Sequence, residues 1–390
     1  MKKKKILYLS YNGMNEALGA SQVLSYLYQL SDEYEYHLVS LEKPKDFRDP
    51  HKMEALQQSL QDKNIFWYPM EYKTDKFGKM FNFFRLLWAS KKIVRQQQIK
   101  FAHARSYFPA MVANFLGLTY LFDTRGFAFD ERADVGSMSR ESVVFSALKK
   151  IEKKLYRDAA GVNKLSYEGK RTIESNELFQ GGEDIKPITV IPTCTDTERF
   201  MLHQRSYDGP VKIGYVGTAT GWYAFNKTLA TLAAIGQHVD YRFIVFNGGQ
   251  HDFIKEKLKE FNIPMQKVSI ESVSFVDMPQ RLKEMEVALF YIHPYFSKRA
   301  SAATKLGEFF ASGIPVLTNA GVGDHEKLIT ESGAGQILDF EKLDSYDFKE
   351  IFRKLRNDEI SKKSRAVAEQ YFSLEKGVGE YRFLYSKIFV

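Results

Sequence analysis

The chain of 390 residues lacks several features that mark common classes of protein. Its single cysteine, Cys194, cannot form a disulfide within the chain, which is typical of a reducing compartment. No apolar run is long enough to cross a bilayer, and the apolar run at residues 6–11 is too short for the core of a signal peptide. These absences predict a cytoplasmic protein.

Sequence motifs for two classes of ligand are also absent. The dinucleotide fingerprint G-x-G-x-x-G does not occur, which disfavours a dehydrogenase. The net charge of +8 indicates an anionic partner, which nucleic acid, anionic lipid or a phosphorylated substrate would satisfy. However, no helix-turn-helix, zinc-ligand spacing or RNP-like motif supports nucleic acid, so we expect no nucleic-acid partner.

Acidic residues are missing from residues 76–122. The same stretch carries Lys76, Lys79, Arg85, Lys91, Lys92, Arg95, Lys100 and Arg105, with Phe77, Met80, Phe81, Phe84, Leu87 and Trp88 at helical spacing. Such spacing is usual for a helix that packs on a core. A wide apolar face among basic residues is also typical of an interfacial helix, so we expect residues 76–100 to contact an anionic membrane surface.

Strand-like and helical segments alternate along the whole chain. The expected strands are residues 6–10, 37–41, 66–70, 101–104, 120–123, 161–165, 188–192, 211–216, 242–246, 268–270, 287–292 and 314–317. This alternation predicts an α/β protein with two Rossmann-like domains, each built on a parallel sheet, facing a central cleft. We place the domains at residues 1–194 and 195–372, with a linker near residues 192–208 and a last helix at residues 373–390 that packs back on the first domain.

Two helix starts are predicted from capping residues. Residues 139–158 form a helix with Ser139 as its N-cap and Val143 facing inward. Asp324 either caps a helix that begins near His325 or contacts a ligand.

Residues 296–318 are the most informative stretch. Small residues precede a short helix, which leaves its first N–H groups available to an anion, and Lys298, Arg299 and Lys305 lie nearby as cations. Glu308 follows one turn into the helix, within reach of a hydroxyl-bearing ligand. A nucleoside diphosphate would satisfy all of these groups. Alternatively, Glu308, Arg299 and Lys305 are ordinary surface charges.

Several motifs together resemble the retaining glycosyltransferases of family 4, which have the GT-B fold. The matching segments are Gly19-Ala20-Ser21, Val190-Ile191-Pro192-Thr193-Cys194-Thr195-Asp196, Tyr215-Val216-Gly217, Thr304-Lys305-Leu306-Gly307-Glu308 and Gly313-Ile314-Pro315-Val316. The stretch Phe122-Asp123-Thr124-Arg125-Gly126-Phe127, followed by Asp130-Glu131-Arg132, resembles a subgroup that serves bacterial surface-polysaccharide pathways. The resemblance spans nearly the whole chain.

The resemblance implies a nucleotide-sugar donor bound by the second domain. Glu308 would hold the ribose hydroxyls, the base would lie against the backbone near Ser272–Ser274, and the diphosphate would meet cations and glycine-rich loops. The donor-binding residues expected on this basis are Glu308, Lys305, Arg299, Gly217, Thr218, Gly248, Val273 and Leu306. The leaving phosphate would act as the base of a retaining transfer. No cofactor and no metal are expected, since the D-x-D sequence of metal-dependent glycosyltransferases does not occur.

Residues at strand ends of the first domain are the expected catalytic and acceptor groups. His103, Asp123 and Arg125 are the catalytic candidates, and Gly19, Ala20 and Arg105 are candidates for an acceptor or phosphate loop. A core histidine is the alternative for His103, and a turn glycine is compatible with either reading of Gly19.

Two departures from the family pattern stand out. Ala300 occupies the position where the E-x7-E motif of the family has its first acid. The usual Arg and Lys after the first strand of the second domain are replaced by Thr218, Thr220 and Gly221, with Lys227 as an uncertain substitute. Diphosphate binding would then fall to Arg299 and Lys305, with Lys298 as a further candidate.

The sequence thus predicts a hexosyltransferase that serves cell-surface polysaccharide synthesis, including lipopolysaccharide. It would move a sugar from a nucleotide donor to a lipid-linked or oligosaccharide acceptor, as a cytoplasmic protein held at the inner face of the cell membrane. The alternatives are a nucleotide-sugar epimerase on the same fold and a noncatalytic basic binding protein.

Overall fold

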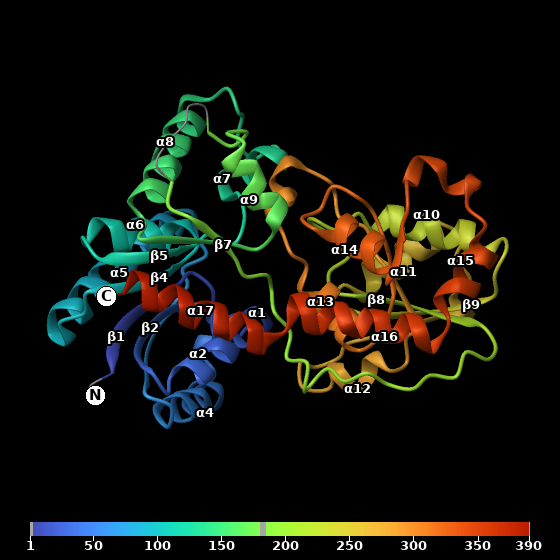
Figure 1. The fold of residues 1–390 in the computed structure, drawn as a ribbon, viewed down its shortest axis with the longest axis horizontal. Helices are drawn as coiled ribbons and strands as arrows, with labels where there is room; N and C mark the ends of the chain where they lie inside the picture. The colour runs from blue at the N-terminus through green and yellow to red at the C-terminus, as the bar shows by residue number, and fades with distance from the viewer. Residues whose placement is uncertain (1–2, 180–184, 390) are drawn as a thin grey trace. The chain divides into compact units, whose positions relative to one another are not determined.

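The computed structural model describes residues 3–179 and 185–389. The chain forms two compact units, which are described separately (Figure 1). The first unit comprises Met1–Pro192 and Leu374–Val390, and the second comprises Thr193–Ser373. The last helix therefore belongs to the first unit although it follows the second in sequence.

The first unit is built on a parallel sheet with the strand order β3-β2-β1-β4-β5-β6-β7. Its strands are β1 (Lys4–Ser10), β2 (Tyr34–Glu42), β3 (Ile65–Glu71), β4 (Phe101–Arg105), β5 (Thr119–Asp123), β6 (Gly161–Lys164) and β7 (Ile188–Val190). Because every neighbouring pair is parallel, the carboxyl ends of all these strands lie at one edge, here called the carboxyl edge.

Helices cover both faces of this sheet. They are α1 (Ala17–Gly19), α2 (Ser25–Leu30), α3 (Pro44–Phe47), α4 (Pro50–Gln61), α5 (Lys76–Gln97), α6 (Tyr107–Phe115), α7 (Ala128–Asp134), α8 (Val143–Asp158), α9 (Tyr167–Glu174) and α17 (Leu374–Ile388), with a π-helical turn, η1 (Ala20–Leu24). Helices α5, α6 and α8 pack side by side on one face, and α17 packs beside α2 on the other (Figure 1).

The second unit repeats the plan with a parallel sheet in the order β10-β9-β8-β11-β12-β13. Its strands are β8 (Val211–Val216), β9 (Tyr241–Phe246), β10 (Val268–Glu271), β11 (Val287–Leu289), β12 (Val316–Thr318) and β13 (Gly335–Ile337). Both faces of the central strands are buried, which explains why these strands read as continuous apolar runs in the sequence.

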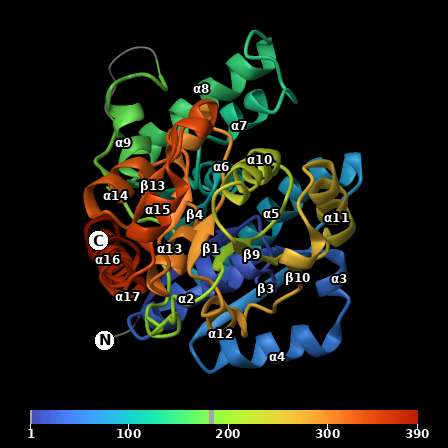
Figure 2. The ribbon, with the colours of Figure 1, turned by 90° about the vertical axis from the view of Figure 1, so that its right-hand side faces the viewer.

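The helices of the second unit also lie on two faces. They are α10 (Phe225–Gly236), α11 (His251–Glu260), α12 (Met278–Leu282), α13 (Thr304–Ala311), α14 (His325–Ser332), α15 (Phe348–Leu355) and α16 (Asp358–Val367), with the shorter turns η2 (Met265–Lys267), η3 (Phe296–Ala300), η4 (Phe340–Ser345) and η5 (Ala368–Phe372). Helices α10 and α11 pack together on one face, and α13 and α14 pack with α16 on the other (Figure 2).

The predicted fold class is confirmed, whereas some local predictions are wrong. Helix α8 begins at Val143 with Ser142 as its N-cap, since the Ser142 hydroxyl accepts a hydrogen bond from the N–H of Phe145. Ser139 lies outside the helix, and the side chain of Val143 is exposed while Phe145 is buried. The short strand β13, which begins with glycine, was not predicted from the sequence.

The segment expected to be a linker packs on the second unit. The guanidinium of Arg205 donates hydrogen bonds to the carbonyls of Met285, Ser312 and Gly313. None of the helices in the described ranges is long and apolar enough to cross a membrane.

Candidate functional site

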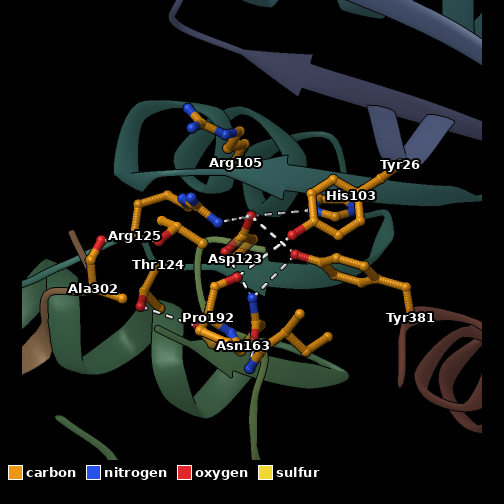
Figure 3. A network of polar contacts seen from close by, with 12 residues as sticks. Tyr26, His103, Arg105, Asp123, Thr124, Arg125, Asn163, Pro192, Ala302 and Tyr381 are labelled. Carbon is orange, nitrogen blue, oxygen red and sulfur yellow. Dashed lines mark hydrogen bonds and ion pairs between the residues drawn. The ribbon is translucent and has the colours of Figure 1, made fainter. Parts of the chain in front are cut away.

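A buried group of polar side chains lies at the carboxyl edge of the first unit (Figure 3). Strand β4 supplies His103, β5 ends in Asp123, and β6 supplies Asn163. Helix α17 adds two tyrosines, Tyr381 and Tyr385. Together with Arg125, these residues are called the Asp123 network below.

Asp123 is the centre of this network. Its Oδ2 lies 3.5 Å from His103 Nε2 and 3.5 Å from Arg125 Nη1, and its Oδ1 accepts a hydrogen bond of 2.9 Å from Asn163 Nδ2. Burial alone would raise the pKa of Asp123, but the charge of Arg125 and the neighbouring His103 outweigh it and hold the pKa well below its usual range. The carboxylate is therefore ionised at neutral pH.

His103 is held on several sides. Its Nδ1 lies 2.6 Å from the hydroxyl of Tyr385, and the centre of its ring lies 4.3 Å from the ring centre of Tyr8. Burial lowers the pKa of His103, although Asp123 acts in the opposite direction. The side chain is fully buried, so the structure gives His103 a place in a bonded core. Its contact with a substrate remains a prediction.

Two residues of this edge adopt strained backbone conformations. Ser106 and Arg125 follow β4 and β5 with φ of 80° and 58°, in the left-handed region that non-glycine residues seldom occupy. The carbonyl of Gly126 accepts hydrogen bonds from Tyr107 Oη at 3.0 Å and Lys164 Nζ at 3.3 Å. The surroundings therefore hold the Arg125 turn in place. Such strain is often stored at functional sites.

The proposed acceptor loop lies at the same edge. Arg105 Nη1 donates a hydrogen bond of 2.9 Å to Asn12 Oδ1, and burial lowers the pKa of Arg105. Gly19 is buried, and a Cβ there would lie only 2.1 Å from the carbonyl oxygen of Gly13. Glycine is thus needed at this position for backbone packing. Ala20 begins the π-helical turn and is half-buried, and a ligand contact at Gly19 or Ala20 remains a prediction.

The second unit places Lys305 in the first turn of α13. Its Nζ lies 3.6 Å from the ring centre of Tyr223, 4.8 Å from Tyr215 and 5.0 Å from Phe290. Among the described residues, the Nζ has no hydrogen-bond acceptor although it is buried. A Cβ at Gly217 would lie 3.1 Å from it, so the ammonium lies directly against the Gly217 loop. Burial lowers the pKa of Lys305.

Glu308 lies one turn further along α13 and is half-buried. Burial raises the pKa of Glu308, against the opposing charges of Lys305 and Arg199. The neighbouring Gly307 allows α13 to approach the start of the second unit, because a Cβ there would lie 2.6 Å from Thr195 Oγ1. The position of Glu308 is therefore fixed by close packing behind it.

The other predicted donor residues are more scattered. Thr218 and Gly248 are exposed in the loops after β8 and β9, and Val273 is half-buried after β10. Arg299 is half-buried in η3, and its Cζ lies 5.3 Å from the ring centre of Phe296. The side chain of Leu306 is fully buried in the hydrophobic core, so it packs the fold.

The structure also shows where Lys227 and Asp324 lie, two residues whose roles the sequence left undecided. Lys227 Nζ lies 3.8 Å from Glu341 and 4.5 Å from the ring of Phe340. Asp324 is the N-cap residue of α14, which begins at His325 as expected, but its side chain makes no capping hydrogen bond and accepts one from Tyr371.

Two positions near α13 bear on the expected donor contacts. Ala300 is fully buried, so an acid at this position would be desolvated. Lys298 is buried with its Nζ 3.4 Å from the ring centre of Trp222.

Several residues of both sites were not predicted from the sequence. Tyr381, Tyr385 and Asn163 were not predicted, and only the expectation that the last helix packs back could have pointed to the tyrosines. Arg199 was also missed. Its guanidinium lies 4.0 Å from the ring centre of Phe275 and donates a hydrogen bond to that residue's carbonyl.

Comparison with known proteins gives matches among solved structures. No protein-family model and no curated protein matches the chain. A sucrose-phosphate synthase from Thermosynechococcus elongatus is 14% identical, with 99% of each chain covered and a TM-score of 0.74. Anabaena HepE, solved in complex with UDP-glucose, is 14% identical, with 98% of this chain and 99% of its own covered and a TM-score of 0.68.

An enzyme of another type gives a weaker match. A putative UDP-N-acetylglucosamine 2-epimerase from Listeria monocytogenes is 12% identical, with 97% of this chain and 94% of its own covered and a TM-score of 0.57. At these identities the likenesses show the fold alone. Together with the two parallel sheets, they establish that this protein has the two-domain GT-B fold.

Proposed function

We propose that the protein is a glycosyltransferase that takes its sugar from a nucleoside-diphosphate donor bound by the second unit. The observation that carries this proposal is that Lys305 Nζ is buried without a hydrogen-bond acceptor among the described residues. A buried ammonium without a hydrogen-bond acceptor is costly, and an anion at the Gly217 loop would supply the missing partner. Glu308, one turn away, offers a carboxylate to the two hydroxyls of a ribose.

The proposed transfer breaks the bond between the anomeric carbon and the terminal phosphate oxygen. The electron pair stays on the phosphate, and Lys305 with the first N–H groups of α13 stabilises that charge. The acceptor oxygen forms the new bond to the anomeric carbon, and its proton passes to the leaving phosphate. The sugar would retain its configuration, and no metal or other cofactor is assigned to the reaction.

The first unit is proposed to bind the sugar and the acceptor. Asp123 is ionised and Arg125 is held in a strained turn beside it, so both present fixed charges at the carboxyl edge. His103 would act through Asp123, because His103 is itself buried and its Nε2 lies 3.5 Å from that carboxylate. We propose a lipid-linked or oligosaccharide acceptor, in cell-surface polysaccharide synthesis that includes lipopolysaccharide.

Contact with the inner face of the cell membrane is proposed for α5. Phe77, Phe81, Phe84 and Trp88 form a stripe along this helix with exposed fractions of 79%, 47%, 42% and 59%, while Leu86 and Leu87 on its other side are buried. Lys91, Lys92 and Arg95 follow and are exposed. An apolar stripe beside basic residues suits an anionic membrane.

Flotation with liposomes tests the proposed membrane contact. The protein should float with phosphatidylglycerol-containing liposomes at low salt and less at high salt, because salt screens the basic residues. Phe77→Ser/Trp88→Ser should float less than Phe115→Ser, which changes an exposed aromatic residue on α6. Failure of the wild type to float at low salt would refute the contact.

A nucleotide-sugar epimerase is the second candidate, supported by the likeness to the Listeria protein. An epimerase would convert a nucleotide sugar without an acceptor. A transferase would release the nucleoside diphosphate only when an acceptor hydroxyl or water takes the sugar. Analysis of the nucleotide products by chromatography separates these two reactions.

A thermal-shift screen against UDP-, GDP-, ADP- and dTDP-sugars tests the central proposal. We expect at least one donor, with UDP-glucose tried first, to raise the melting temperature of the wild type. Glu308→Ala should lose that rise and its turnover while keeping the unliganded fold. An equal rise in Glu308→Ala would sink the assignment of this site.

A further inference from the structure

A chain of aromatic rings links α5 to the carboxyl edge of the first unit. Trp88 lies 6.4 Å from Phe84, Phe84 lies 5.5 Å from Phe83, Phe83 lies 6.2 Å from Phe108, and Phe108 lies 5.1 Å from Tyr11, all measured between ring centres. These rings are called the aromatic path. They come from α5, from the start of α6 and from the loop after β1, so three separate segments build it.

The path leads from the surface toward the candidate site. Trp88 and Phe84 are exposed, whereas Phe83, Phe108 and Tyr11 are half-buried. Tyr11 directly follows β1, and Phe108 is the second residue of α6 after β4, so the inner end lies at the carboxyl edge.

A buried arginine lies close to the inner end. The next residue after Tyr11 is Asn12, whose Oδ1 accepts the hydrogen bond from Arg105 Nη1. Arg105 is buried, and within residues 3–179 and 185–389 its Nε has no hydrogen-bond acceptor. Burial and Tyr72 raise the pKa of Tyr11 to about 12, while Arg132 acts in the opposite direction.

The residue types of the aromatic path favour a hydrocarbon ligand over a sugar chain. Four of its five rings belong to phenylalanine and tryptophan side chains that carry no carboxylate or amide for sugar hydroxyls. The stretch 76–122 that supplies four of these rings contains no acid. Apolar rings that end near Arg105 fit a ligand with a hydrocarbon tail and an anionic head.

We propose that the aromatic path binds the hydrocarbon tail of a lipid phosphate that carries the acceptor sugar, with its phosphate at Arg105. This inference rests on the proposed glycosyltransferase function and specifies the substrate class of its acceptor side. The exposed stripe of α5 would then be the entrance through which the tail leaves a membrane.

Binding of lipid phosphates by calorimetry tests the path in the full chain. Farnesyl phosphate and dodecyl phosphate represent prenyl and acyl tails, and inorganic phosphate represents the head alone. We expect the wild type to bind at least one lipid phosphate about tenfold or more tightly than inorganic phosphate, because the tail removes apolar surface from water. The tail that binds more tightly shows whether the natural lipid phosphate carries a prenyl or an acyl tail.

Two variants of α6 provide a matched pair. Phe108→Ser should weaken lipid phosphate binding about tenfold, while Phe115→Ser, at a residue 73% exposed at the other end of the same helix, should leave it unchanged. Equal affinities of lipid and inorganic phosphate in the wild type, or equal losses in the two variants, would overturn the proposal. If Phe108→Ser fails to fold, Phe84→Ser replaces it with the same expected result.

Nucleotide binding separates this inference from the proposed function. The Phe108→Ser variant should bind the donor nucleotide as the wild type does, since Lys305 and Glu308 belong to the other unit. Donor binding without lipid phosphate binding would overturn the aromatic path and leave the transferase proposal standing. A loss of donor binding in Lys305→Met without any change in lipid phosphate binding would support both.

Discussion

The Asp123 network of the first unit and the Lys305 site of the second unit, formed by Lys305 with Tyr215, Tyr223 and Phe290, each contain a buried charged group. The two groups differ in the partners that the protein gives them. Asp123 is surrounded by Arg125, His103 and Asn163, so its charge is matched within the protein. Lys305 faces aromatic rings and, in the described part of the chain, no hydrogen-bond acceptor. The Asp123 carboxylate is paired without a ligand, whereas the Lys305 ammonium gains its best partner only when an anion binds.

This contrast predicts opposite effects on stability when each charge is removed. Loss of a matched charge strands its partners, whereas loss of an unmatched one removes a desolvation cost. When each charge is removed by substitution, the sign of the change in the free energy of unfolding therefore shows whether that charge stabilises the fold or serves to bind a ligand.

The largest effect is expected for Asp123→Asn. The substitution leaves the half-buried Arg125 without its ion pair to the buried Asp123, so the free energy of unfolding should fall by about 3–5 kcal/mol. Urea unfolding followed by circular dichroism measures this change. Asp158→Asn, at a more exposed ion pair with Lys154, is the control and should change stability by less than about 1 kcal/mol. Equal effects of the two substitutions would contradict the contrast.

Lys305→Met should act in the opposite direction. Methionine keeps the apolar stem among Tyr215, Tyr223 and Phe290 and removes the ammonium, so the unliganded protein should gain about 1–3 kcal/mol. The exposed Lys259→Met is the matched control and should leave stability nearly unchanged. A clear loss of stability in Lys305→Met would mean that the ammonium already has a partner.

The pH dependence of stability sharpens the comparison through Lys164. This residue is fully buried, but its Nζ donates to the carbonyl of Gly126 and to the hydroxyl of Tyr156. Burial lowers the pKa of Lys164 to about 7 from its ordinary value of 10.5. Between these values the unfolded chain binds more protons than the folded one, so stability should rise with pH.

We expect a rise of roughly 1–3 kcal/mol between neutral pH and pH 9, and a smaller one in Lys164→Met. Urea unfolding at several pH values provides the measurement. A slope that is unchanged in Lys164→Met would show that other groups cause it.

The smallest effect is expected for Tyr381→Phe. Its hydroxyl lies 3.1 Å from Asn163 Nδ2 and 3.5 Å from Asp123 Oδ2, so its removal should cost about 1 kcal/mol of stability. Thermal unfolding compared with Tyr28→Phe, whose hydroxyl pairs with Ser59 at the surface, measures this difference. A larger loss in Tyr28→Phe would contradict a structural role for the α17 hydroxyl.

The fold was predictable from the sequence because its strands are continuous apolar runs that alternate with amphipathic helices. The second site was partly predictable, since Lys305 and Glu308 lie within one helical turn of each other. Only the fold brings His103 to Tyr385, so no local pattern pointed to this pair. The start of α8 was placed too early because Ser139 and Ser142 are both acceptable caps by residue type.

The most direct test of the unmatched cation is calorimetric titration of UDP, GDP, ADP and dTDP into the wild type, Lys305→Met and Lys259→Met. We predict that the wild type and Lys259→Met bind at least one of these diphosphates equally well. Lys305→Met should bind it about tenfold to a hundredfold more weakly, because a charge-assisted hydrogen bond to the diphosphate is lost. Equal affinities in all three proteins, or no binding to the wild type, would contradict the account.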